Sequence, residues 1–286
     1  MQITLDHVSH TYQPGSPFQA TAIEDVSLTI SSGEFLALIG HTGSGKSTLA
    51  QHLNGLLLPT SGKVFIDGRD IHEKGFDKKD IRKAVGLVFQ YPEHQLFEET
   101  VARDVAFGPK NMGLGKDEID ERVREALESV GLPYDQFAEK SPFELSGGQM
   151  RRAAMAGVLA MRPEILVLDE PAAGLDPQSR EDMLSLIAAL HEKGRTIVMI
   201  SHAMDDVARF ATRAIVMEKG KIAMEGAPEE IFTHAEKLQQ MGLDVPSVCQ
   251  LFIALKKAGL QVPDHIFRQE DACKALLALW KGAASC

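Results

Sequence analysis

The chain has 286 residues, 44% of them hydrophobic, and a formal net charge of −10. That length accommodates one large α/β domain with a small appendage, and the composition is that of a globular protein with a real core. The acidic excess disfavours sequence-independent binding to nucleic acids, because such binding requires a basic field around the phosphates.

Membrane insertion and secretion are also disfavoured by the sequence. No window approaches the roughly 18 to 20 continuous apolar residues that cross a bilayer. The N-terminus lacks the charged-then-apolar order of a signal peptide. We therefore expect the chain to stay in the cytosol.

The N-terminal part predicts a small antiparallel β layer. Residues 2–8 and 26–30 alternate apolar and polar side chains, as strands with one covered face do. Tyr12 lies between them, ahead of a turn-rich run at 13–17. Two interpretations of its ring are open: it stacks on the adenine of a nucleotide, or it is an ordinary half-buried strand tyrosine.

A phosphate-binding loop follows this layer. Residues 40–47 fit the template G-x-x-x-x-G-K-[ST], between a buried strand predicted at 35–39 and a helix predicted from Ser47 to Leu58, where Pro59 stops it. Glycines let backbone N–H groups converge on phosphates, and the helix N-terminus adds its positive end. Lys46 is expected to neutralise the β/γ-phosphates and Ser47 to bind Mg²⁺. The predicted nucleotide-binding residues here are Gly40, His41, Thr42, Gly43, Ser44, Gly45, Lys46, Ser47 and Thr48.

A helical insertion is predicted next. After a strand at 63–66 and an Asp67-Gly68 turn, the apolar run 85–89 delivers Gln90, which either reaches Mg²⁺ or the attacking water or is only a loop residue. One helical face is predicted over 116–130, with Gly131 as its stop. Four acidic residues either rim a groove that receives arginines of a membrane partner or form a solvated face. They are Glu93, Glu98, Glu99 and Asp104.

A second anion site is predicted where residues 145–149 open a further helix. Ser146 is placed as the N-cap, and two glycines free the first N–H groups. The alternative is a plain capped helix without a ligand. The residues are Leu145, Ser146, Gly147, Gly148 and Gln149.

Charged groups then follow two buried strands. Asp169 and Glu170 end the strand predicted at 165–170, which is a costly place for charge without function. Asp169 is expected to hold Mg²⁺ through water and Glu170 to polarise the attacking water. His202 follows the strand at 196–200 and either donates to the γ-phosphate or is structural. Between these strands, Asp176 is predicted as the N-cap of a helix that starts at Pro177.

Taken together, these motifs resemble an ATP-binding cassette (ABC) ATPase over residues 1–225, in order and approximate spacing. The resemblance implies a P-loop NTPase (RecA-like) core, an antiparallel β subdomain and a helical subdomain at about 91–163. It also implies ATP and Mg²⁺ as cofactors. In this family two cassettes sandwich two ATP molecules, so the signature residues 145–149 are expected to act on the nucleotide at the partner's Lys46, with Asp176 at the dimer interface.

Residues 89–93 and 141–152 are similar to the energy-coupling factor group, and Met150-Arg151-Arg152 favours the second of its two paralogous ATPases. The resemblance implies pairing with a paralogue or with itself, a transmembrane coupling subunit and a substrate-binding membrane subunit. It implies a peripheral position on the cytoplasmic face of the membrane and uptake of a vitamin or transition-metal ion. Ala172-Ala173 stands where many cassettes carry Thr-Ser or Thr-Ala, yet hydrolysis is still expected. The alternatives are another importer class and a soluble switch.

The tail, residues 226–286, is expected to lie outside the common cassette. Two amphipathic helices, at 247–258 and 270–281, either pack on their own cassette or pair with a partner's tail. The spacing of Cys249, Cys273 and Cys286 fits neither a zinc site nor a disulfide framework, so free thiols are expected.

Overall fold

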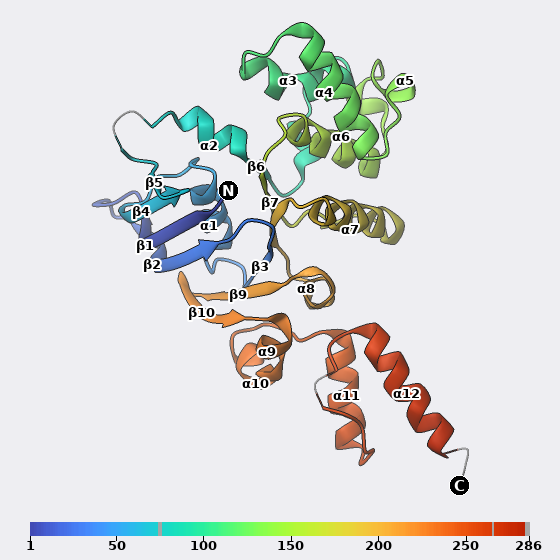
Figure 1. Ribbon diagram of the computed structural model, residues 1–286. Coiled ribbons are helices and arrows are strands. Elements are labelled where there is room, and N and C mark those ends of the chain that lie inside the picture. Colours follow the sequence, from blue (N-terminus) through green and yellow to red (C-terminus); the bar gives the residue numbers. More distant parts are fainter. Residues whose placement is uncertain (74–75, 265, 284–286) are drawn as a thin grey trace.

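Two β-sheets form the frame of the molecule, which Figure 1 shows as a computed structural model. The structure describes residues 1–73, 76–264 and 266–283. The antiparallel sheet has the order β2-β1-β4-β5, made of β1 (Ile3–Tyr12), β2 (Ala20–Ile30), β4 (Ser61–Ile66) and β5 (Arg69–Asp70). The larger sheet has the order β10-β9-β3-β8-β7-β6, made of β3 (Phe35–Ile39), β6 (Val85–Val88), β7 (Ile165–Asp169), β8 (Thr196–Ile200), β9 (Arg213–Glu218) and β10 (Lys221–Gly226). The predicted α/β class with a separate antiparallel β layer is confirmed.

The first two strands are longer than the alternating pattern predicts. β1 and β2 pair in antiparallel register from Ile3 opposite Ile30 to Tyr12 opposite Ala20. The register shifts along the way, and His7 and Asp25 have positive φ angles of 51° and 55°. These irregularities break the polar and apolar alternation, so a period-2 pattern stops before the strand does.

The larger sheet has a parallel centre and helices on both faces. β6, β7, β8, β3 and β9 run parallel, and only β10 is antiparallel, at the edge. Leu36 and Leu38 pack in the core shared with the antiparallel sheet, whereas Phe35, Ala37 and Ile39 pack in the core on the other face. Burial on both faces explains the continuous apolar runs from which these strands are predicted.

The helices near the sheets include α1 (Lys46–Leu53), α2 (Lys78–Ala84), α7 (Pro177–Glu192) and α8 (Met204–Phe210). The prediction for α1 is wrong at its C-terminal end, because the helix stops at Leu53 rather than at Leu58. Gly55 has a left-handed φ of 67° and its N–H bonds to the carbonyl of His52. The glycine at position 55 therefore ends the helix at Leu53, six residues before Pro59.

The predicted helical insertion lies between β6 and β7 and forms the group at the top right of Figure 1. Ile119, Val123, Ala126 and Leu127 are buried along α4, and Gly131 follows it with a φ of 70°, as the pattern predicts. The elements are the short 3₁₀ turns η1 (Pro92–Gln95) and η2 (Pro142–Glu144) with α3 (Val101–Asn111), α4 (Lys116–Ser129), α5 (Tyr134–Phe137) and α6 (Gly147–Leu159).

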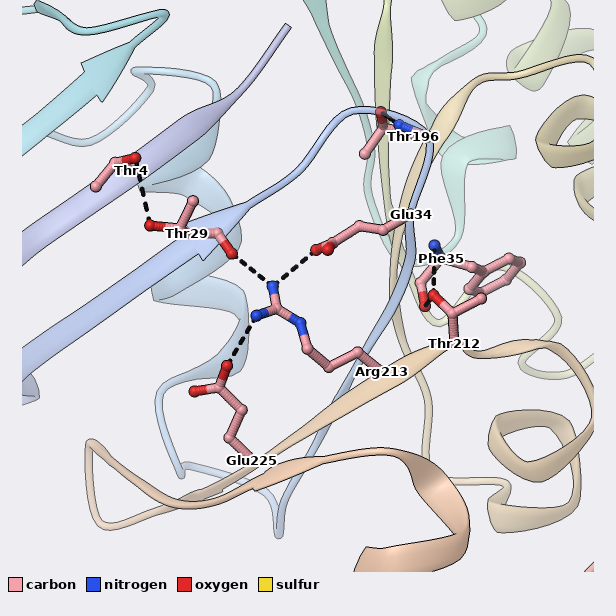
Figure 2. A network of polar contacts seen from close by, with 9 residues as sticks. Thr4, Thr29, Glu34, Phe35, Thr196, Thr212, Arg213 and Glu225 are labelled. Atoms are coloured by element: carbon pink, nitrogen blue, oxygen red, sulfur yellow. Dashed lines mark hydrogen bonds and ion pairs between the residues drawn. The ribbon is translucent and has the colours of Figure 1, made fainter.

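Arg213 joins the two sheets through the network in Figure 2. It lies at the start of β9, and its guanidinium donates to the carbonyl oxygen of Thr29 at 2.5 Å. The same group pairs with Glu34 and with Glu225 of β10, each at 2.8 Å. One side chain therefore holds the end of β2, the turn before β3 and the edge strand together.

The C-terminal extension contains α9 (Pro228–Thr233), α10 (Ala235–Gln240), α11 (Ser247–Lys257) and α12 (Gln269–Ala283). The two predicted tail helices are confirmed as α11 and α12. Cys249 of α11 packs in the main core, while Phe252, Val262 and Ala272 form a small cluster of their own. The extension thus packs on its own cassette, and pairing with a partner's tail stays a prediction.

The cysteines are free where the structure describes them: Cys249 is buried and Cys273 exposed. Cys286 lies outside the described residues. Within the described part of the chain, no helix has both the length and the apolar character that crossing a bilayer requires. The domain boundary at residue 225 stays a prediction.

Candidate functional site

The phosphate loop connects β3 to α1, as predicted. Gly40 and Gly45 have φ angles of 154° and 104°. A Cβ atom at Gly40 would lie 2.4 Å from the Met217 carbonyl oxygen, and one at Gly45 would lie 2.5 Å from that of Ala22. Both positions therefore require glycine, because backbone atoms that cannot move aside occupy the space. Gly45 also begins α1 without a side-chain cap, which leaves the first N–H groups of the helix for an anion.

Lys46 is folded over this loop. Its ammonium donates to the carbonyl oxygens of Gly40 at 2.6 Å and His41 at 2.9 Å, and the residue is only 6% exposed. Burial lowers the pKa of Lys46, although the nearby Glu170 and Asp169 carboxylates oppose the shift. A buried ammonium of this kind is stabilised by an incoming anion such as a phosphate.

Asp169 and Ser47 form the oxygen pair at which a divalent cation is expected. Asp169 ends β7, and the Ser47 hydroxyl hydrogen-bonds to its carboxylate. Burial raises the pKa of Asp169, while Ser47 and Lys46 oppose that shift. A hydroxyl and a carboxylate suit Mg²⁺, which prefers hard oxygen ligands and keeps waters and phosphate oxygens for the rest. Among the described residues, no cluster of three or more acidic, histidine or cysteine side chains could hold a metal ion.

Glu170 stands at the centre of the predicted catalytic residues. Its carboxylate accepts a hydrogen bond from Gln90 Nε2 at 3.1 Å and lies 2.9 Å from His202 Nε2. The residue has a left-handed φ of 50°, and its N–H donates to the carbonyl oxygen of Ile200 on β8. The structure thus brings together three side chains that the sequence places 80 and 32 residues apart.

A cavity of about 150 Å³ adjoins this group. Glu170 and His202 line it together with Ser201, Arg180 and Asp206. Arg180 of α7 contacts both carboxylate oxygens of Asp206 of α8 at 2.6 Å. Space for a small reactant therefore exists beside Glu170, between the loops that follow β7 and β8.

Tyr12 lies at the end of β1, beside α1. Its hydroxyl is 3.2 Å from Thr48 Oγ1, and 40% of the residue is exposed. The ring is therefore attached to the helix of the phosphate loop while keeping free surface. Its position suits a base-stacking role, which stays a prediction.

The signature residues lie at the start of α6, and the predicted N-cap is confirmed. The Ser146 hydroxyl accepts from Gln149 N–H, and the Gln149 side chain accepts from Ser146 N–H. Ser146 and Gly147 are exposed, while Leu145 packs in the main core. Leu145 thus anchors the segment in the core, and Ser146 and Gly147 lie at the surface, where they can contact another molecule.

Asp176 is the N-cap of α7, as predicted. Its carboxylate accepts from the N–H groups of Gln178 and Ser179. A Cβ atom at Gly148 would lie 2.7 Å from Ser179 Oγ. The start of α6 therefore lies against the start of α7, and the Asp176 segment and the signature segment neighbour one another.

The acidic-rim interpretation needs correction for two of its four residues. Glu93 pairs with Arg151 at 2.5 Å, and Asp104 is buried, where it accepts from the N–H groups of Phe97 and Glu98. Burial raises the pKa of Asp104. Both carboxylates serve this chain's own fold; of the other two residues, Glu99 is exposed and Glu98 is half-buried.

Arg151 is the connecting residue that the sequence did not reveal. It is 2% exposed and donates to both Glu93 oxygens, to the Pro171 carbonyl oxygen and, at 2.5 Å, to that of Ala173. Burial alone would raise the pKa of Glu93, but hydrogen bonds and charge interactions, chiefly those with Arg151, together outweigh burial and hold that pKa below its usual range. The available signal was the pair Arg151-Arg152, which precedes a run of small and apolar residues in the same helix.

A groove of about 820 Å³ runs between α2 and the helical insertion. Lys79, Arg82 and Lys83 line one side. On the other side, Phe97 and Phe107 meet edge to face with ring centroids 5.1 Å apart, and they are 61% and 47% exposed. Apolar rings that are open to solvent in a groove are typical of a binding surface for another protein.

Comparison with known proteins gives consistent results. The profile of the family described as ABC transporter matches residues 23–173. The chain is 52% identical over 286 residues to the energy-coupling factor transporter ATP-binding protein EcfA2 of Clostridium tetani, covering 100% of this chain and 99% of that protein. It is 51% identical over 282 residues to the protein of the same name in Symbiobacterium thermophilum, covering 99% and 98%.

Solved structures resemble the fold as well. CbiO1 of Clostridium perfringens, described as part of the ABC transporter complex cbiONQ, has a TM-score of 0.72 at 36% identity, covering 83% of this chain and 93% of that one. A dimeric ATP-binding cassette in a post-hydrolysis state, bound to ADP and Pi, has a TM-score of 0.68 at 31% identity, covering 79% and 98%.

Proposed function

Because this chain belongs to the ABC transporter family and is an energy-coupling factor ATP-binding subunit, we propose that Glu170 is the catalytic carboxylate with which it hydrolyses ATP. The contact of Gln90 and His202 with the Glu170 carboxylate beside the phosphate loop carries this assignment. The full-length likeness to energy-coupling factor subunits favours this group over another importer class or a soluble switch.

The roles of the side chains follow from their positions. The phosphate-loop N–H groups and Lys46 bind the phosphates, and Tyr12 stacks on the adenine. Ser47 and Asp169, with Gln90, would hold Mg²⁺, and the ion would supply positive charge to offset that of the phosphates. Glu170 polarises the attacking water, and His202 donates to the γ-phosphate oxygen. In this structure His202 Nε2 lies 2.9 Å from the Glu170 carboxylate.

Replacement of the carboxylate tests the assignment. Glu170→Gln is expected to keep ATP binding and to lower the turnover number by about 10²- to 10⁴-fold, because an amide cannot accept the water proton. Glu192→Gln, at the exposed end of α7, is the matched control and should behave as wild type. Hydrolysis by Glu170→Gln at a rate near wild type would refute the assignment.

Each ATP site is shared between two cassettes in this proposal. The exposed Ser146 and Gly147 begin α6 in the insertion, away from the phosphate loop between β3 and α1. A second anion site of this kind is most useful when it faces the γ-phosphate of a neighbouring cassette, where closure excludes water. The neighbour is a paralogous subunit or a second copy of this chain.

Mixing two inactive chains tests the shared site. A Ser146→Arg chain combined with a Glu170→Gln chain forms one intact site per mixed dimer, so activity should return. Where the chain pairs only with a paralogue, the substitutions are divided between the two subunits. Continued inactivity of mixed dimers that are shown to form contradicts sharing.

The membrane partners complete the proposed function. The groove beside Phe97 and Phe107 receives helices of a transmembrane coupling subunit, which places the chain on the cytoplasmic face of the membrane. A separate membrane subunit binds the vitamin or transition-metal ion. Purification of the tagged chain from detergent extract should recover very hydrophobic partners, whereas Phe107→Asp should lose them and still bind ATP. Unchanged recovery with that variant contradicts this role of the groove.

A further inference from the structure

Three aromatic rings, those of His52, His10 and Tyr12, form a row in which neighbours meet edge to face. The His10 ring lies with its centroid 4.6 Å from that of Tyr12, at an interplanar angle of 77°. The His52 ring lies 4.9 Å from that of His10, at 72°. His10 and Tyr12 are two residues apart on β1, so they share a face of the strand, and His52 belongs to α1. The phosphate-loop helix therefore supports Tyr12 through two histidines.

Hydrogen bonds also hold the three aromatic side chains in place. The His52 ring donates from Nδ1 to the Thr48 carbonyl oxygen at 2.7 Å, and the Tyr12 hydroxyl meets the Thr48 side chain. His10 Nδ1 bonds to the Leu58 carbonyl oxygen at 3.0 Å. Each of the three rings is thus fixed by a neighbouring ring and by a polar contact. Thr48 directly follows Ser47, so the same turn of α1 carries the predicted cation ligand.

Exposure increases along the row. His52 is fully buried, His10 is half-buried and Tyr12 is 40% exposed. Tyr12 is thus the most exposed of the three rings and stands at the outer end of the row. An aromatic ring binds a planar base better when its orientation is already fixed, because less side-chain freedom is lost on binding.

We propose that His10, backed by His52, is a positioning residue that presents the ring of Tyr12 to the adenine base of ATP. The inference rests on the proposed stacking role of Tyr12. It extends the nucleotide site inward by two residues that do not touch the nucleotide. Their effect is on the binding of the base and not on phosphate chemistry.

Steady-state kinetics of the assembled ATPase test this inference. His10→Asn keeps a group that can donate to Leu58 but lacks the ring edge, and it should raise the KM for ATP by about 3- to 10-fold with kcat unchanged. His10→Phe loses the hydrogen bond to Leu58 but keeps an aromatic ring beside Tyr12. Because the ring is the supporting group, the KM of this variant for ATP should stay near the wild-type value. His191→Ala removes a histidine that packs edge-on against Phe35, and serves as a control that should leave KM unchanged.

A double variant separates positioning from a general structural role. Because His10 acts through Tyr12, adding His10→Asn to Tyr12→Ala should raise KM no further than Tyr12→Ala alone. Inorganic tripolyphosphate has no base and binds only where the phosphates bind. Its dissociation constant, measured by competition with ATP, should be the same for wild type and His10→Asn. A weaker affinity of His10→Asn for tripolyphosphate would indicate a distorted phosphate loop and overturn the inference.

The remaining outcomes are distinguishable. If Tyr12→Ala leaves KM unchanged, the stacking role in the proposed function fails and the inference fails with it. If Tyr12→Ala raises KM and His10→Asn does not, only the inference is overturned. If His10→Asn fails to fold, His52 can be substituted instead. His52→Phe keeps a supporting ring and His52→Ala removes it, so the KM for ATP should rise only in His52→Ala. An unchanged KM for His52→Ala would contradict the inference.

Discussion

The strand ends that carry the ATP site and the helices of the C-terminal extension are held by very different amounts of packing. Every residue of β3 is buried, and so are the first four of β7, which deliver the phosphate loop and Asp169. Parts of the extension, including Phe232 and Cys249, pack in the main core, but its last two helices also rely on a separate cluster of three buried residues, Phe252, Val262 and Ala272. On α12, Leu277 and Trp280 are 54% and 73% exposed.

This difference teaches how the two regions can serve ATP-driven work. A side chain at the end of a strand that is buried on both faces has its position fixed by the backbone, which suits chemistry that requires sub-ångström placement. Helices held by a thin core and polar contacts can change their arrangement at a small cost in free energy. The extension is therefore suited to adjustable contacts and the strand ends to fixed ones.

The largest expected effect compares the same substitution in the two regions. Leu38→Ala removes a fully buried side chain of β3 and should lower the free energy of unfolding by about 2–5 kcal/mol. Leu277→Ala, on the exposed face of α12, should change it by less than about 0.5 kcal/mol. Urea denaturation followed by circular dichroism measures both. Equal losses would remove the contrast in packing.

The second effect is a pH dependence confined to the cassette. Burial lowers the pKa of His52 from 6.5 to about 4. Between these values the unfolded chain takes up a proton that the folded chain does not, so the contribution of His52 leaves stability highest above pH 6.5 and lowers it as the pH falls towards 4. The loss should reach about 3 kcal/mol.

Substitution isolates this contribution from that of the carboxylates. His52→Leu should lose about 3 kcal/mol less than wild type when denaturation at pH 7.5 is compared with denaturation near pH 4. His234→Leu, in the extension, serves as the control. Parallel pH profiles for wild type and His52→Leu would contradict a depressed pKa for His52.

The smallest effect concerns the attachment of the extension. Asp205 of α8 accepts from both the N–H group and the hydroxyl of Ser247, at 2.9 and 2.7 Å. Ser247→Ala should cost about 0.5–1.5 kcal/mol and act locally. Trp280, the only tryptophan in the sequence, lies on α12 and reports the extension alone. In Ser247→Ala, the fluorescence of Trp280 should show a transition at a lower urea concentration than in wild type, while ATP binding is unchanged. If Trp280 and the rest of the chain show the same transition, the extension and the cassette unfold together.

The sequence predicted elements whose signals are local. β3, β7 and β8 are continuous apolar runs, and Asp176 with Pro177 marks the start of α7 by cap chemistry alone. Gln90, Glu170 and His202 were predicted because parallel strands end at one edge of a sheet, a rule of topology that needs no distances.

The missed features depend on contacts between distant segments. Glu93 and Asp104 looked like free surface charges because nothing near them in sequence indicates Arg151 or a buried turn. The row of His10 and His52 is equally hidden, since the two residues lie on different elements and pair only after β1 meets α1. Pattern rules assign a residue to an element, whereas its partner is chosen by tertiary packing.

The Arg213 network has a mechanical consequence. Rotation of the antiparallel sheet against the larger one would pull the Arg213 guanidinium away from Thr29 of β2, because Arg213 and Glu225 both belong to the larger sheet (Figure 2). Because Arg213 ties β2 to the turn before β3, we expect Tyr12 of β1 and Lys46 after β3 to keep their relative positions when the protein moves. When two such cassettes close on each other, we expect little of the motion to be taken up by bending inside either cassette. The motion is then passed on to the proteins bound to them.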